Sequence, residues 1–265
     1  MLNEKFFSQI VHLAADSIIA VDDNLKVVYF NREAEKVFGY CFDEIVGQHL
    51  NVLIPSRYHD QHDQYVRQFN ESGVTARLMG ERTAEVQALR RDGREFFAEI
   101  SIVKAGKFLA AIIRDVTEKK EIEKQLKIFA EYDSLTGIMN RRKIEEVAQI
   151  EIERASRFSR TLSLLLLDID HFKRINDAYG HDVGDLAIKH LVSVSTKNMR
   201  KVDSMGRWGG EEFIILLPEV GKEGISVFAE KIRRAVEQQP LRLDDHKKIF
   251  STISIGGTIY NKPVQ

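Results

Sequence analysis

The stretch Arg207–Phe213, which reads RWGGEEF, places the strongest constraint on how this chain folds. Its two adjacent glycines supply the positive φ of a tight hairpin turn, and an apolar strand-like run follows. A turn needs permissive residues but no paired carboxylates, and Glu211 and Glu212 repel each other. Asp168 and Asp170 form a second acidic group at the end of another apolar segment. The sequence therefore predicts two strand ends that meet around a hard cation such as Mg²⁺.

These residues resemble the GGDEF family of diguanylate cyclases, in its GGEEF form. Three further motifs of the family occur in the expected order: Asp133–Arg142 (DSLTGIMNRR), Asp168–Asp177 (DIDHFKRIND) and Gly180–Asp185 (GHDVGD). The resemblance covers residues 133–265. It implies an α/β (α+β) nucleotidyl-cyclase-like domain that condenses two GTP molecules into cyclic di-GMP and pyrophosphate.

The resemblance also implies the metal ligands. Asp168, the backbone carbonyl of Ile169 and Glu211 would hold Mg²⁺, or Mn²⁺ in its place. Glu211 would also help to activate the attacking ribose 3′-hydroxyl, and Glu212 would assist metal or nucleotide binding.

Four further residues are expected at the substrate. Asn176 and Asp185 would read the guanine edge, since an amide donates and accepts while a carboxylate accepts from guanine N1 and N2. Lys173 would contact phosphate as a point charge, and Phe172 belongs to the same substrate site.

A product-inhibition site is implied just upstream of the hairpin. Arg200 and Asp203 match the family's R-x-x-D pattern, and Lys231 stands where the family often has a third basic residue, an arginine. Arginine pairs with phosphate through its fork and aspartate accepts from guanine. On its own, R-x-x-D is usually a helix-end ion pair.

The family normally continues for about thirty residues beyond its S-I-G strand, here Ser254–Gly256, with a helix that supplies a lysine and an arginine to the triphosphate. This chain stops at Gln265. We therefore expect a shortened domain in which those two phosphate contacts have no counterpart.

The N-terminal part resembles a PAS sensor domain with a five-stranded antiparallel sheet. Short helices fill about 32–70, and the closing Arg114–Thr117 (RDVT) is typical of the family's end. The expected strands are 17–21, 26–31 and segments near 75–90, 94–103 and 107–115.

A haem b is the predicted ligand of this domain. His62 on a helix and Arg82 on a strand resemble the proximal ligand and the oxygen-stabilising arginine of haem PAS domains in oxygen-sensing kinases. His59 is a competing surface histidine. A PAS domain without haem, acting only in dimerisation, remains an alternative.

The segment 118–132 is predicted to be a helical coiled-coil linker between domains 1–117 and 133–265. Ile122, Leu126 and Phe129 recur at spacings of four and three, which favours a homodimer. A solvated helical spacer is the plainer interpretation of the same segment.

The composition limits the partners and the cellular location to expect for this chain. The net charge of −1 argues against a general nucleic-acid partner. No apolar run approaches the ~20 residues that span a bilayer, and a single cysteine fits a reducing cytosol. We therefore predict a cytoplasmic, dimeric, gas-regulated cyclase that binds GTP, with O₂ as the candidate gas and cyclic di-GMP as product and inhibitor. The alternative is a non-catalytic receptor for GTP or cyclic di-GMP.

Overall fold

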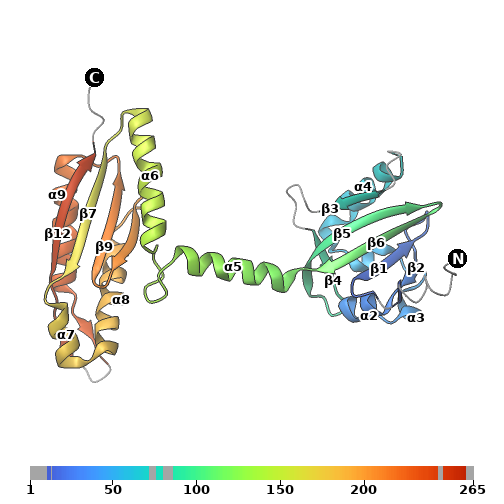
Figure 1. Cartoon of the computed structure of the whole chain (residues 1–265), viewed down its shortest axis with the longest axis horizontal. Coiled ribbons are helices and arrows are strands. Elements are labelled where there is room, and N and C mark those ends of the chain that lie inside the picture. Colours follow the sequence, from blue (N-terminus) through green and yellow to red (C-terminus); the bar gives the residue numbers. More distant parts are fainter. Residues whose placement is uncertain (1–10, 13, 72–75, 80–85, 244–246, 261–265) are drawn as a thin grey trace. The chain divides into compact units, whose positions relative to one another are not determined.

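The computed structural model describes residues 11–12, 14–71, 76–79, 86–243 and 247–260. The chain divides into two compact units, Met1–Lys124 and Gln125–Gln265, each with its own antiparallel sheet and hydrophobic core (Figure 1). None of the helices in the described ranges has the length and apolar character that crossing a bilayer requires.

The N-terminal unit is built on an antiparallel sheet with strand order β2-β1-β6-β5-β3, and β4 also pairs with β5. Its strands are β1 (Ser17–Val21), β2 (Val27–Phe30), β3 (Ala76–Met79), β4 (Gln87–Leu89), β5 (Glu95–Ala105) and β6 (Phe108–Asp115). The predicted antiparallel sheet is confirmed, with one difference. The segment near 75–90, expected as one strand, contains two short strands that pair with different stretches of β5.

Short helices cover one face of this sheet. They are α2 (Arg32–Phe38), α3 (Phe42–Ile45), the 3₁₀ turns η1 (Leu50–Leu53) and η2 (Ser56–Tyr58), and α4 (His59–Glu71). Phe38 of α2 is fully buried and packs edge-on against Phe96 of β5, with ring centroids 5.3 Å apart. Val66 and Phe69 of α4 join the same core.

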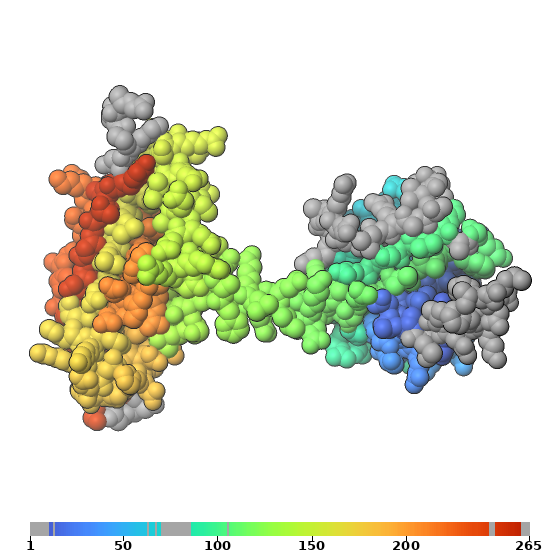
Figure 2. All heavy atoms as spheres, viewed as in Figure 1, coloured from blue at the N-terminus to red at the C-terminus, as the bar shows by residue number. Residues whose placement is uncertain are grey.

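The helix α5 (Thr117–Glu131) has no buried residue. Leu126 and Phe129 are 62% and 71% exposed, and Figure 2 shows the side chains of α5 open to solvent on the face in view. An isolated helix of this length is marginal in water, and α5 carries an exposed apolar stripe.

The C-terminal unit has an antiparallel sheet of order β12-β7-β9-β8. Its strands are β7 (Leu162–Ile169), β8 (Ser204–Gly209), β9 (Glu212–Pro218) and β12 (Ile253–Tyr260), with a small ribbon of β10 (Leu241–Arg242) and β11 (Lys248–Ile249). Its helices are α6 (Arg141–Phe158), α7 (Phe172–Tyr179), α8 (His181–Lys197) and α9 (Lys222–Gln238).

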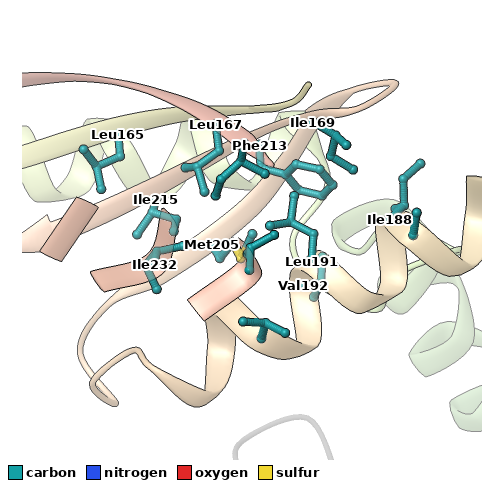
Figure 3. Close-up of a cluster of buried hydrophobic side chains, with 14 of the residues drawn as sticks. Leu165, Leu167, Ile169, Ile188, Leu191, Val192, Met205, Phe213, Ile215 and Ile232 are labelled. Carbon is teal, nitrogen blue, oxygen red and sulfur yellow. The ribbon is translucent and has the colours of Figure 1, made fainter. Parts of the chain in front are cut away.

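Of the two central strands, β9 is buried on both faces, whereas β7 is buried on one face and leaves Leu166 41% exposed on the other. Phe213 and Ile215 of β9 face the core formed with α8 and α9, which Figure 3 shows. The alternate residues Ile214 and Leu216 pack with Ile144 of α6 on the other face. Burying each such side chain contributes about 1.5–3 kcal/mol to the stability of the fold. The packed strands therefore hold the polar residues at their ends in place.

Candidate functional site

Two strand ends bring the predicted acidic residues together. In the β7–β9 pair, Asp168 lies opposite Glu212, and β8 and β9 are joined by a tight turn that contains Gly210 and Glu211. Gly210 has a φ of +49°, whereas Gly209 does not have a positive φ. The expectation that both glycines adopt positive φ was therefore wrong. Gly209 is instead the ladder partner of Glu212 and closes the strand pair.

The electrostatics of Asp168 show how closely the carboxylates approach. Burial, followed by the negative charges of Glu211, Glu212 and Asp170, raises the pKa of Asp168 above its usual range. A carboxylate that is held among like charges is stabilised by a cation. The donor set present here therefore fits a divalent metal.

The predicted donor set of two carboxylates and one backbone carbonyl suits Mg²⁺. Within the described residues, no group of three or more His, Cys, Asp or Glu side chains is arranged to hold a metal. Mg²⁺ is usually held by one or two carboxylates, with waters and substrate phosphates completing its shell. The predicted ligands are the carboxylates of Asp168 and Glu211 and the carbonyl of Ile169, which agree with this coordination preference. Their role remains a prediction.

Asp170 has a different environment, although it lies two residues from Asp168. Its two oxygens accept hydrogen bonds from the hydroxyls of Thr252, at 2.5 Å, and Ser254, at 2.6 Å. These bonds lower the pKa of Asp170. Through these hydrogen bonds, the Asp170 carboxylate connects the end of β7 to the start of β12.

Replacing Asp168 tests the metal assignment by stability alone. The raised pKa of Asp168 means that its ionised carboxylate destabilises the metal-free folded state. This destabilisation is lost as the pH falls through the pKa of the folded state. At pH 7 we expect metal-free Asp168→Asn to melt no lower than wild type, while the rise in melting temperature that Mg²⁺ gives wild type is lost. Asp170→Asn is the control and should melt lower, because two hydroxyl donors lose their charged acceptor. An Asp168→Asn protein that keeps the full response to Mg²⁺ would exclude Asp168 as a ligand.

Arg207 is a site residue that sequence reasoning did not identify. Its Nε donates to the carbonyl of Gly210 at 2.8 Å, and its Nη1 lies 3.2 Å from both carboxylate oxygens of Asp133. Its backbone nitrogen donates to the carbonyl of Met139 at 2.8 Å. Arg207 thus ties the turn that carries Glu211 to the motif 133–142. The available signal was its place in the hairpin motif, three residues before Gly210.

The predicted guanine-reading residues lie on two packed helices. Asn176 is on α7 and Asp185 is on α8, and Gly180, with a φ of +87°, joins the two helices. Asp185 and Lys173 are exposed, and Phe172 is half-buried. The carboxamide oxygen of Asn176 is buried, with no hydrogen-bond partner in the part of the chain that the structure describes. Among the described residues, the helix pair therefore has one buried polar atom without a partner, Oδ1 of Asn176, beside the exposed Asp185 and Lys173.

The residues of the predicted inhibitory site also lie near one another. The guanidinium of Arg200 donates to both carboxylate oxygens of Asp203, with the shortest contact at 2.6 Å from Nη2 to Oδ1. Asp203 has a fully buried side chain, whereas that of Arg200 is half exposed. Arg200 and Lys231 line the same hollow, about 450 Å³ in volume. A second hollow of about 530 Å³ is also lined by Arg200, with Arg154 and Arg160 beside it.

The predicted haem residues are only partly described. His62 lies on α4 and is half-buried, whereas Arg82 lies outside the described residues. His59, the competing histidine, has its Nε2 2.9 Å from the carbonyl oxygen of Ile54.

Comparison with known proteins agrees with this geometry. The family described as "Diguanylate cyclase, GGDEF domain" matches residues 130–265, and the PAS fold matches residues 5–109. The chain is thus a nucleotide-cyclase-type domain joined to a sensory one, an arrangement that belongs to signal transduction. It is a member of the GGDEF family.

Individual relatives match different shares of the chain. The chain is 39% identical to Bacillus subtilis (strain 168) YhcK over 62% of its length and 46% of that protein's. It is 39% identical to Escherichia coli (strain K12) diguanylate cyclase DgcM over 49% of this chain and 32% of DgcM. It therefore spans less than half of these curated relatives. The solved coiled coil and GGDEF domain of Caulobacter crescentus DgcB, in complex with c-di-GMP, is 28% identical, with a TM-score of 0.52, over 55% of this chain and 78% of that one.

Proposed function

We propose that this protein is a diguanylate cyclase, which joins two GTP molecules into cyclic di-GMP and releases two pyrophosphates. The observation that carries the proposal is the meeting of Asp168 with Glu211 and Glu212 at the ends of β7 and β9. Membership of the GGDEF family supports the same activity.

The proposed chemistry assigns a separate task to each group. The 3′-hydroxyl oxygen of one GTP attacks the α-phosphorus of the other, the bond to pyrophosphate breaks, and a second attack closes the ring. Asp168, the Ile169 carbonyl and Glu211 would hold Mg²⁺, which when bound neutralises phosphate charge and makes the 3′-hydroxyl easier to deprotonate. Glu211 accepts the proton from that hydroxyl, and Glu212 assists at the same edge.

Substrate recognition is assigned to the α7–α8 pair. Asn176 and Asp185 would hydrogen-bond the guanine edge, and Lys173 would contact phosphate from an exposed position on the same helix as Asn176. Phe172, at the start of α7, lines the substrate site beside them.

Catalysis of this kind requires two domains that face each other, each with one GTP. We propose that a homodimer provides them, and the exposed Ile122, Leu126 and Phe129 of α5 support a paired-helix contact. Ligand binding in the sensor would then act on the facing geometry through this helix.

Nucleotide turnover separates this proposal from the receptor alternative. Protein with Mg²⁺ should release pyrophosphate from GTP but not from ATP, as measured by a coupled phosphate assay. A receptor would bind GTP or cyclic di-GMP, as seen by calorimetry, and release no pyrophosphate. That second result would reject the cyclase assignment.

Product inhibition is the proposed role of Arg200, Asp203 and Lys231. Because Arg200 is half exposed and lines a hollow with Lys231, a phosphate can approach both cations. Arg200→Ala should raise the cyclic di-GMP concentration that halves turnover by about tenfold or more, with the initial rate unchanged. Equal inhibition in Arg200→Ala and wild type would remove this role.

Haem binding by the PAS domain is a second proposal, with His62 as the ligand because of the resemblance to haem PAS domains. Val66 and Phe69 of α4 are buried in the core, and His62 lies four residues before Val66, so it shares their helix face. His59, seven residues before Val66, lies on the same face, and its Nε2 is 2.9 Å from the Ile54 carbonyl oxygen. Haem bound at His62 would supply an iron for O₂, and Arg82 remains the predicted oxygen-side residue. A Soret band in the purified protein is the first test.

A further inference from the structure

Gly184 of α8 faces the carboxamide of Asn176 at unusually close range. A Cβ built on Gly184 would lie 1.9 Å from Oδ1 of Asn176 and 3.0 Å from its Cγ. It would also lie 3.2 Å from Cζ of Phe172. Only a residue without a side chain leaves room for Asn176 as it is placed here.

The conformation of the backbone does not explain this glycine. Gly184 lies within the first turns of α8 and has no positive φ, so any L-residue could adopt its backbone geometry. Within a helix, glycine is less favourable than alanine, because glycine loses more backbone conformational entropy on folding. The requirement for glycine therefore comes from the neighbouring side chain.

The placement of Asn176 has a chemical consequence. Its Oδ1 is the buried end of the carboxamide and accepts no hydrogen bond within the described ranges. Since the oxygen and nitrogen of a carboxamide point in different directions, an inward oxygen leaves the nitrogen, a donor, for a ligand. The neighbouring Asp185 is exposed and offers only acceptors when ionised.

We infer that Gly184 is a specificity-determining positioning residue, which holds the Asn176 carboxamide with its donor toward the base. This inference rests on the proposed function, since it specifies how that guanine site selects its base. Guanine presents the O6 acceptor where adenine presents an amino donor. A fixed donor from Asn176 suits guanine and meets another donor in adenine. Gly184 touches no substrate and acts through Asn176.

The test uses 3′-deoxy-GTP and 3′-deoxy-ATP, which lack the attacking hydroxyl and cannot turn over. Calorimetry with Mg²⁺ should show that Gly184→Ala weakens 3′-deoxy-GTP binding by about tenfold or more. The preference for 3′-deoxy-GTP over 3′-deoxy-ATP should fall by a similar factor. The melting temperature should not fall, because alanine favours the helix and the atom that must yield is the end of a side chain.

A double-mutant cycle shows whether Gly184 acts through Asn176. In the Asn176→Ala background, adding Gly184→Ala should change the affinity for 3′-deoxy-GTP by less than about twofold. Gly256→Ala is the matched control, since a Cβ there meets nothing within 4 Å, and its affinity should equal that of wild type.

The outcomes separate the inference from the function on which it rests. If the wild-type protein binds 3′-deoxy-GTP, and Gly184→Ala binds it with the same affinity and the same base preference, only the inference about Gly184 is overturned. A tenfold loss that persists in the Asn176→Ala background also overturns that inference alone. Wild-type protein that binds neither nucleotide overturns both the guanine site and this role of Gly184.

Discussion

Glu211→Gln should lower the rate of cyclic di-GMP formation by at least about a hundredfold while the fold remains intact. The substitution removes the proposed proton acceptor and one of two carboxylate metal ligands, and general-base catalysis alone contributes about 10²–10⁴-fold. Glu211 also raises the pKa of Asp168 through its negative charge. The neutral variant therefore relieves a repulsion, and its metal-free melting temperature should equal or exceed that of wild type.

A surface glutamate provides the control for this experiment. Glu237 of α9 forms an ion pair with Arg233, with Arg233 Nη1 3.0 Å from Glu237 Oε2. Surface pairs of this kind contribute little, so Glu237→Gln should keep wild-type turnover and stability. Near-wild-type turnover in Glu211→Gln would exclude Glu211 as both base and essential ligand.

His62→Ala should abolish haem binding, so that the Soret band present in wild type is lost. A haem held through one protein–iron bond depends on that ligand, and His62 is half-buried on the face of α4 that also carries the buried Val66. Absorption spectra of protein expressed with added haem precursor measure this directly.

His59→Ala is the matched control for the haem experiment. It removes a histidine of the same helix whose ring lies 2.9 Å from the Ile54 carbonyl, so the Soret band should keep its position and intensity. A Soret band that survives His62→Ala unshifted would identify another ligand, and no band in wild type would exclude haem altogether.

The fold was predictable where hydrophobic patterning determines the structure. The strand 17–21 occurs as predicted, and the apolar segment before Asp168 forms β7, because sheet packing buries these residues. The segment near 75–90 was harder, since a pattern cannot show where one strand stops pairing and another begins along β5.

The candidate site was predictable only as a set of motif residues. The motifs identify Asp168, Asn176 and Glu211 as site residues. No single motif predicts how residues of different motifs lie relative to one another in the folded domain. The bond from Arg207 to the Gly210 carbonyl and the close approach of Gly184 to Asn176 both depend on how separate elements pack. The assignment of positive φ to Gly210 alone likewise depends on the strand register, which makes Gly209 a ladder residue.

The most direct test of the cyclase assignment is the identity of the product. Wild-type protein with GTP and Mg²⁺ should form cyclic di-GMP, identified by mass spectrometry, together with two pyrophosphates for each molecule formed. The rate per protein should rise with protein concentration until dimers dominate, because each domain brings one GTP. Folded protein that binds GTP and Mg²⁺ at dimer-forming concentrations, yet yields no cyclic di-GMP, would contradict the assignment.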